Sequence, residues 1–91
     1  MVYPMRESSI EAVFAKRVRE LGGLSFKFAP TVAGNPDRIV LLPGGIVKFV
    51  ELKADGGKLR PDQILWHRRA LDLGTEVDVV TGSAEARNWL P

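Results

Sequence analysis

Two apolar runs near the middle of the chain, with a turn signal between them, dominate the pattern of hydrophobic and polar positions. Residues 38–42 form the first run, residues 46–50 form the second, and a Pro-Gly-Gly sequence at residues 43–45 separates them. Short apolar runs that flank a glycine-rich turn are typical of a β-hairpin. We therefore expect one strand over residues 37–42 and an antiparallel partner over residues 46–53.

The length of the hairpin loop decides which side chains share a face of the sheet. Counting outward from a loop of three residues places Asp37 directly opposite Glu51. A loop of Gly44 and Gly45 alone would put the two carboxylates on opposite faces, because a slip of one residue turns every side chain over. We favour the three-residue loop, because Pro43 suits a strand ladder poorly and glycine supplies the left-handed conformation that such loops need.

The rest of the pattern predicts three helices and two further strands. Ser8 and Glu11 resemble a capping box at the start of the first helix, Pro61 suits the first position of the second, and Ser83 is a candidate cap for the third. The expected elements are helices over residues 8–21, 61–73 and 83–89 and strands over residues 24–28, 37–42, 46–53 and 77–80.

This order, αβββαβα, indicates an α/β protein with a mixed sheet of four strands and helices packed on it. The segment from the strand at residues 46–53 through the second helix to the strand at residues 77–80 has the form of a parallel crossover. The chain has 91 residues, which suits one small domain over residues 1–91.

Two carboxylates and an ammonium group converge at one end of the predicted hairpin. Lys53 lies two residues beyond Glu51, so it shares the face on which Asp37 and Glu51 oppose each other. Like charges directly opposite each other destabilise a sheet. A divalent cation bound between the two carboxylates would remove that penalty.

Composition sets only outer bounds on function. The formal net charge of +2 permits binding to nucleic acid without requiring it. The chain has no cysteine, which excludes disulfides and thiolate metal sites. No apolar stretch approaches the length of a membrane span and the N-terminus lacks a signal-peptide core, so we expect no membrane partner and a cytoplasmic location, in a bacterium or a phage-infected host cell.

The residues around the hairpin resemble a known nuclease signature. Pro36-Asp37 followed by Glu51-Leu52-Lys53 is similar to the PD-(D/E)xK motif. The wider pattern resembles the stand-alone VRR-NUC (virus-type replication-repair nuclease) domains of phages and bacteria. It comprises Gly22-Gly23, Lys27-Phe28, Pro36-Asp37-Arg38, Leu42-Pro43-Gly44-Gly45, Phe49-Val50-Glu51-Leu52-Lys53-Ala54, Gly57-Lys58-Leu59 and Gln63. Arg60 departs from the small polar residue common in that family, which puts the cap of the second helix in doubt.

The resemblance implies a restriction-endonuclease-like core and a metal-dependent DNA endonuclease. Asp37, Glu51 and the backbone carbonyl of Leu52 would hold Mg²⁺ or Mn²⁺, and Lys53 would orient the nucleophile or stabilise negative charge. The family resemblance also implies a homodimer that acts on branched or junction DNA.

A further carboxylate is expected from the first helix. Glu11 fits the family pattern better than Glu7, which lies one turn earlier on the same side. Glu11 could instead complete the capping box with Ser8.

The second helix carries one further candidate, Gln63. In similar nucleases a glutamine here lies near the catalytic lysine and the scissile phosphate, whereas the alternative is a solvent-exposed residue at the helix start. His67 lies one turn later on the same face, where packing is the more common role of a lone histidine. Trp66 and Trp89 are expected in the core or in dimer contacts.

Basic residues surround the proposed site in sequence and could contact DNA phosphates: Lys58, Arg60, Arg68 and Arg69. A solvated helix face is the alternative for this group. Two other functions also stay open at this point. The chain could be a catalytically inactive nucleic-acid-binding module, or an interaction domain whose acidic pair forms surface salt bridges.

Overall fold

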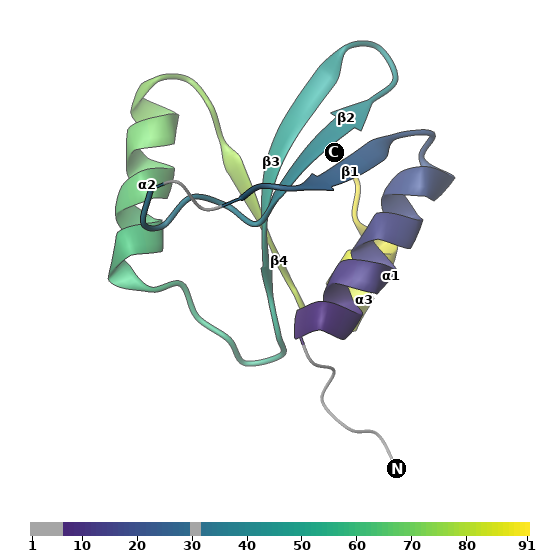
Figure 1. Cartoon of the computed structure of the whole chain (residues 1–91), viewed down its shortest axis with the longest axis horizontal. Coiled ribbons are helices and arrows are strands. Elements are labelled where there is room, and N and C mark those ends of the chain that lie inside the picture. The colour runs from purple at the N-terminus through teal and green to yellow at the C-terminus, as the bar shows by residue number, and fades with distance from the viewer. Residues whose placement is uncertain (1–6, 30–31) are drawn as a thin grey trace.

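The computed structural model describes residues 7–29 and 32–91 and contains three helices and four strands within those ranges (Figure 1). In chain order the elements are α1 (Glu7–Glu20), β1 (Leu24–Lys27), β2 (Arg38–Leu42), β3 (Ile46–Lys53), α2 (Pro61–Asp72), β4 (Val77–Thr81) and α3 (Gly82–Asn88). This order is the expected αβββαβα arrangement.

The four strands form one mixed sheet in the order β1-β2-β3-β4. The β1-β2 and β2-β3 pairs are antiparallel, whereas β3 and β4 are parallel and are connected through α2. The predicted mixed sheet and the predicted parallel crossover are therefore confirmed.

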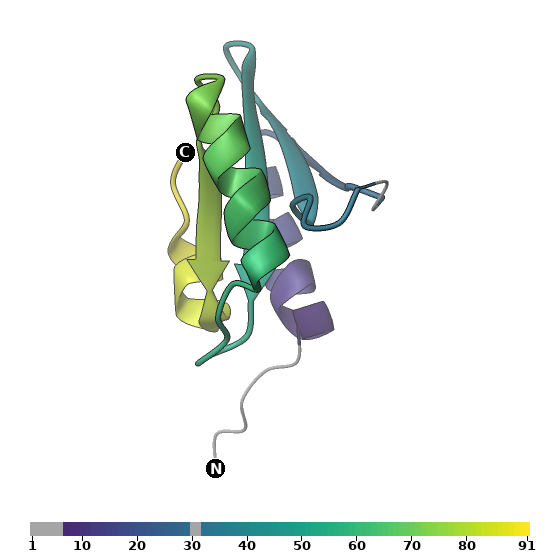
Figure 2. The same cartoon turned by 90° about the vertical axis from the view of Figure 1, so that its left-hand side faces the viewer.

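Helices cover both faces of the sheet. Figure 1 shows α1 and α3 on one side and α2 on the other, and in Figure 2 α2 stands in front of the sheet. The main core lies under α1 and α3, because the apolar stripe of α1 packs on the side chains that alternate toward that face. Its buried members are Ile10, Phe14, Val18, Val40, Leu42, Val50, Leu52, Val80, Ala86 and Trp89. On the opposite face Trp66 of α2 packs edge-on against Phe49, with ring centroids 6.0 Å apart.

The hairpin has the register of a three-residue loop. Leu42 pairs with Ile46, and Arg38 pairs with Val50. The loop residues Gly44 and Gly45 both have positive φ angles, of 88° and 76°, a conformation in which a side chain would be strained. The alternative loop of two residues is excluded. Continuing the same register by one position brings Asp37 opposite Glu51.

Two predicted helix caps were wrong. Helix α1 begins at Glu7, so Ser8 lies inside its first turn, and α3 begins at Gly82, so Ser83 also lies inside a helix. A capping residue must have non-helical backbone angles, and neither serine is placed to provide them. The side chains of Glu7 and Ser8 lie outside the described residues.

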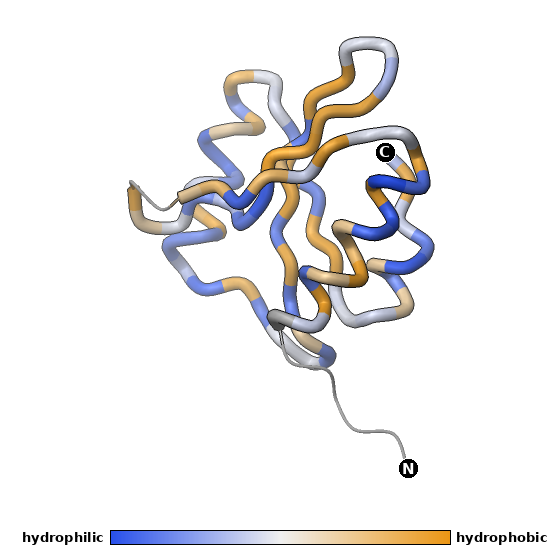
Figure 3. The backbone as a smooth tube through the Cα atoms, turned by 45° about the vertical axis from the view of Figure 1, so that its right-hand side comes forward, coloured by the Kyte–Doolittle hydropathy of each residue, from blue (hydrophilic) through white to orange (hydrophobic). Residues whose placement is uncertain are grey.

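A row of apolar side chains remains exposed on the α2 side of the sheet. Leu24, Leu41 and Val47 are cross-strand partners on β1, β2 and β3, and they are 58%, 40% and 55% exposed. Figure 3 shows the hydrophobic strands of the hairpin extending beyond the helices. Helix α2 packs on the other end of this face, through Trp66 and Phe49, and leaves this row partly exposed.

Within the described residues, no helix is both long enough and apolar enough to cross a membrane.

Candidate active site

A cavity of about 680 Å³ lies at the end of the hairpin strands that is remote from their turn. Five of the residues singled out in the sequence line it together: Glu11, Asp37, Lys53, Arg60 and Gln63. They come from α1, from the entry to β2, from the end of β3 and from the start of α2. The fold therefore gathers side chains that are far apart along the chain.

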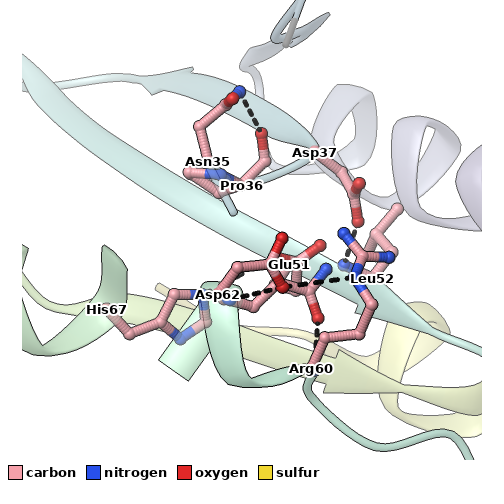
Figure 4. A network of polar contacts seen from close by, with 9 residues as sticks. Asn35, Pro36, Asp37, Glu51, Leu52, Arg60, Asp62 and His67 are labelled. Carbon is pink, nitrogen blue, oxygen red and sulfur yellow. Dashed lines mark hydrogen bonds and ion pairs between the residues drawn. The ribbon is translucent and has the colours of Figure 1, made fainter. Parts of the chain in front are cut away.

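The backbone around Asp37 holds its carboxylate in a defined position. Pro36 is fully buried, and the carbonyl of Asp37 accepts a hydrogen bond of 2.8 Å from the backbone N–H of Phe28. The carboxylate oxygen Oδ2 accepts another bond of 2.8 Å from the backbone N–H of Leu52 (Figure 4). Asp37 thus joins the entry of β2 to the end of β3, a role that the spacing of the motif did not predict.

Glu51 is the least ordinary side chain of the site. It is completely buried, and neither of its carboxylate oxygens has a hydrogen-bond partner. Burial is the largest cause that raises the pKa of Glu51 from its ordinary 4.5 to about 9. Asp37 raises it further, through its charge and through its closeness to the protonated carboxyl group, although no bond between the two side chains meets ordinary hydrogen-bond geometry. Lys53 and Arg60 act in the opposite direction. At neutral pH the carboxyl group is therefore protonated when no cation is present.

His67 on α2 lies beside Glu51, a contact that the sequence did not reveal. Its Nε2 atom lies 3.6 Å from Oε1 of Glu51. Burial and the positive charge of Lys53 lower the pKa of His67 below its ordinary 6.5. Both partners are therefore uncharged near pH 7, and the contact is not an ion pair in that state. The helical spacing to Gln63 is the sequence signal that pointed to this face.

Gln63 is 4% exposed, which excludes the solvent-exposed alternative. Its Oε1 atom accepts a hydrogen bond of 2.9 Å from the backbone N–H of Arg60, the residue before α2. The guanidinium group of Arg60 has no acceptor atom with which to cap the helix. The side chain of Gln63, in the first turn, instead accepts the backbone N–H that precedes the helix. The nitrogen end of the carboxamide keeps its two N–H donors, and a role near the phosphate stays a prediction.

Lys58, Arg68 and Arg69 are exposed and lie outside the lining of the main cavity. Arg69 instead borders a second, apolar cavity together with Phe49 and Trp66. Arg60 faces the main cavity and also pairs with Asp62, at 3.3 Å.

Of the two tryptophans expected in the core or in dimer contacts, Trp89 belongs to the buried core and Trp66 does not. Trp89 is 7% exposed, packs edge-on against Phe14 and donates a hydrogen bond to Asp78, whereas Trp66 is half-buried against Phe49. Neither indole is needed to explain the chemistry of the cavity.

Gly34 holds one wall of the cavity and was not identified from the sequence. It is buried with a φ angle of 87°, and a Cβ atom there would collide with the backbone carbonyl of Asp62. The loop before Asp37 therefore packs directly on the first turn of α2. Its Gly-Asn-Pro sequence indicates a turn, but a turn signal does not say what the turn touches.

We expect Gly34→Ala to destabilise the protein by about 2–4 kcal/mol, because strain from the left-handed backbone adds to the collision with Asp62. Gly44→Ala is the matched control, since its φ angle is 88° and no atom lies within 4 Å of the added carbon. That change should cost only about 1–2 kcal/mol. Urea denaturation measures the free energy of unfolding of both variants. An equal decrease in the two would show that the contact of Gly34 with α2 does not contribute to stability.

The donor set fits a hard divalent cation. Glu51 presents two buried oxygens without partners beside Asp37, and all the candidate ligands are oxygen atoms. In the part of the chain described, residues 7–29 and 32–91, no three His, Asp or Glu side chains are grouped closely enough to hold a metal ion by themselves. Mg²⁺ commonly needs only one or two carboxylates and completes its shell with water and substrate oxygens.

Of the two candidate carboxylates on α1, Glu11 borders the cavity. The competing role in a capping box is wrong, because Ser8 lies inside the helix and not at its cap. The position of the Glu7 side chain lies outside the described residues.

Comparisons with known proteins identify the family of this chain. The VRR-NUC domain model matches residues 5–84. "Putative nuclease p44" of Acyrthosiphon pisum secondary endosymbiont phage 1 is 43% identical over 88 residues, which span 96% of this chain and 94% of that protein. A solved structure described as a VRR_NUC domain superposes with a TM-score of 0.80 at 34% identity and covers 88% of each chain. The chain therefore belongs to the VRR-NUC family of nuclease domains.

Proposed function

We propose that this protein is a divalent-metal-dependent endodeoxyribonuclease that cuts branched or junction DNA as a homodimer. The observation that carries the proposal is the buried Glu51 carboxyl group, which lies behind the cavity lining, beside Asp37, and has no partner at hydrogen-bond distance. Asp37 and Lys53 line the cavity itself. Burying such a group is costly unless a partner of opposite charge compensates for it. Membership of a nuclease family supports the same assignment.

Asp37, Glu51, the carbonyl of Leu52 and Glu11 would hold Mg²⁺ or Mn²⁺. When bound, such a cation neutralises charge on the scissile phosphate and acidifies water. Lys53 would stabilise the negative charge that develops on the phosphate, or orient the attacking water.

Gln63 would present its N–H donors to the phosphate from the floor of the cavity. Arg60 lines the same cavity, and Lys58, Arg68 and Arg69 would contact phosphates further along the strand. These contacts carry no base information, so they suit selection by DNA shape better than selection by sequence.

The exposed row of Leu24, Leu41 and Val47 supports self-association. A contiguous apolar patch on a small domain commonly marks a protein interface. A second copy would cover the row and would place two active sites on one branched substrate. We place this activity in the cytoplasm of a bacterium or a phage-infected host cell.

The test is cleavage of labelled four-way junction, flap and linear duplex DNA in Mg²⁺, Mn²⁺ or EDTA. We expect cutting with either cation, none in EDTA, and the fastest cutting on the junction. Asp37→Asn and Lys53→Ala should each lower the rate by about 10³-fold. Asparagine keeps an oxygen to accept the N–H of Leu52, so this variant separates the lost charge from lost structure.

Asp72→Asn and Lys16→Ala are the matched controls, because both side chains are exposed and neither lines the cavity. Both should cut like the unaltered protein, and sedimentation velocity on the same preparations should give a dimer. Cutting in EDTA would contradict the metal dependence. If folded, dimeric protein cut no substrate with either cation, an inactive nucleic-acid-binding module would be the better assignment.

A further inference from the structure

Two buried polar groups face each other without bonding. The His67 side chain is 14% exposed and that of Glu51 is 1% exposed, and 3.6 Å separates Nε2 from Oε1. Within the described residues, the only buried side-chain nitrogen or oxygen atoms without a hydrogen-bond partner are this Nε2 atom and the two carboxylate oxygens of Glu51. All the buried side-chain polar atoms that lack a hydrogen-bond partner in the described residues therefore belong to one contact.

Such a concentration calls for a physical reason. Buried polar atoms are nearly always hydrogen-bonded, and an N–H···O bond spans about 2.7–3.2 Å. The observed separation is a few tenths of an ångström too long, so a small movement of either side chain would close the bond.

The surroundings hold His67 over β3. Its neighbour Trp66 packs on Phe49 of that strand, and Gln63, one turn earlier, is buried at the start of the same helix. The backbone N–H of Leu52, the next residue on that strand, is already bonded to Asp37. His67 brings its Nε2 atom to 3.6 Å from Oε1 of Glu51, which is close enough for a small movement to form a hydrogen bond.

We propose that His67 is a positioning residue, which donates a hydrogen bond from Nε2 to Oε1 of Glu51 when that carboxylate holds a cation. This inference rests on the proposed metal-dependent function. A charged, buried carboxylate needs its remaining lone pairs satisfied, and carboxylates that bind metals are commonly hydrogen-bonded by a second residue. In the tautomer that carries its proton on Nε2, the neutral imidazole supplies one N–H to Glu51.

The test measures cation affinity in the absence of DNA. Mn²⁺ is titrated into the full chain by calorimetry, and free Mn²⁺ is followed by electron paramagnetic resonance. We expect His67→Leu to weaken Mn²⁺ binding by about 10- to 100-fold, because Glu51 loses its orienting donor. His67→Gln, which keeps an N–H at similar reach, should restore affinity to within about 3-fold of the unaltered protein.

A double-variant comparison tests whether the effect passes through Glu51. In a Glu51→Gln background, His67→Leu should change Mn²⁺ affinity by less than about 2-fold. Thermal melting checks folding, and His67→Phe replaces His67→Leu if the leucine variant is unfolded.

Equal Mn²⁺ affinity in the unaltered and His67→Leu proteins would overturn the inference and leave the proposed function standing. An equal loss in the Glu51→Gln background would also overturn it. If the unaltered protein bound no Mn²⁺, both would fall together.

Discussion

Glu51→Gln is expected to make the metal-free protein more stable and, at the same time, to reduce DNA cleavage by about 10³-fold. The pKa of Glu51 is about 9 in the folded protein and ordinarily 4.5. Between those values the folded state binds a proton that the unfolded state lacks, so stability falls as the pH rises through this window. Glutamine has no proton to gain, and we expect it to raise the free energy of unfolding by about 1–3 kcal/mol at pH 8.5.

Urea denaturation in EDTA at pH 5 and pH 8.5 measures this effect. The difference between the variant and the unaltered protein should be small at pH 5 and large at pH 8.5. Glu85→Gln makes the same chemical change at an exposed position on α3 and should alter neither stability nor cleavage. If Glu51→Gln were less stable than the unaltered protein at pH 8.5 in EDTA, burial of the Glu51 carboxyl group would not destabilise the folded state.

Cation affinity is expected to rise steeply with pH, by up to about tenfold per unit between pH 6 and pH 8. A cation must displace the proton that Glu51 carries in this range, and a higher pH makes that displacement easier. His67 adds less to the effect than an ordinary histidine would, because burial and the positive charge of Lys53 lower its pKa. Above about pH 9, where Glu51 ionises without help, the affinity should level off.

Calorimetry in buffers of different protonation enthalpy measures the accompanying proton release, which should be about one proton per cation at pH 7. Glu51→Gln is the control in which that release disappears. An affinity that did not change between pH 6 and pH 8 would mean that Glu51 is already ionised in the metal-free protein.

Hydrophobic periodicity predicted the elements and their order, because each strand and helix buries one face and shows that face in the sequence. The hairpin register followed from Pro43 and the two glycines after it, and it brought Asp37 opposite Glu51. The helix starts were less accurate, since Ser8 and Ser83 each lie inside a helix rather than at its cap. A serine that could cap a helix predicts the start of that helix only to within one or two residues.

The properties that make the site unusual could not be predicted from the sequence. Burial of Glu51 depends on how α2 packs over the end of β3, which is a matter of tertiary packing. The approach of His67 to Glu51 needs the same packing, because the two residues belong to different elements. The motif spacing identified the chemical groups, and only the fold revealed their environment.

The three-residue turn of the hairpin also limits how this protein can change in length. The five residues of β2 separate Asp37 from the turn, so Pro43 lies roughly 20 Å from Asp37 at the usual rise per residue. Loss of one turn residue would nevertheless shift one strand against the other and separate the two carboxylates onto opposite faces. Insertions and deletions in relatives should therefore spare this distant turn and collect in the segments that do not set the pairing of β2 with β3.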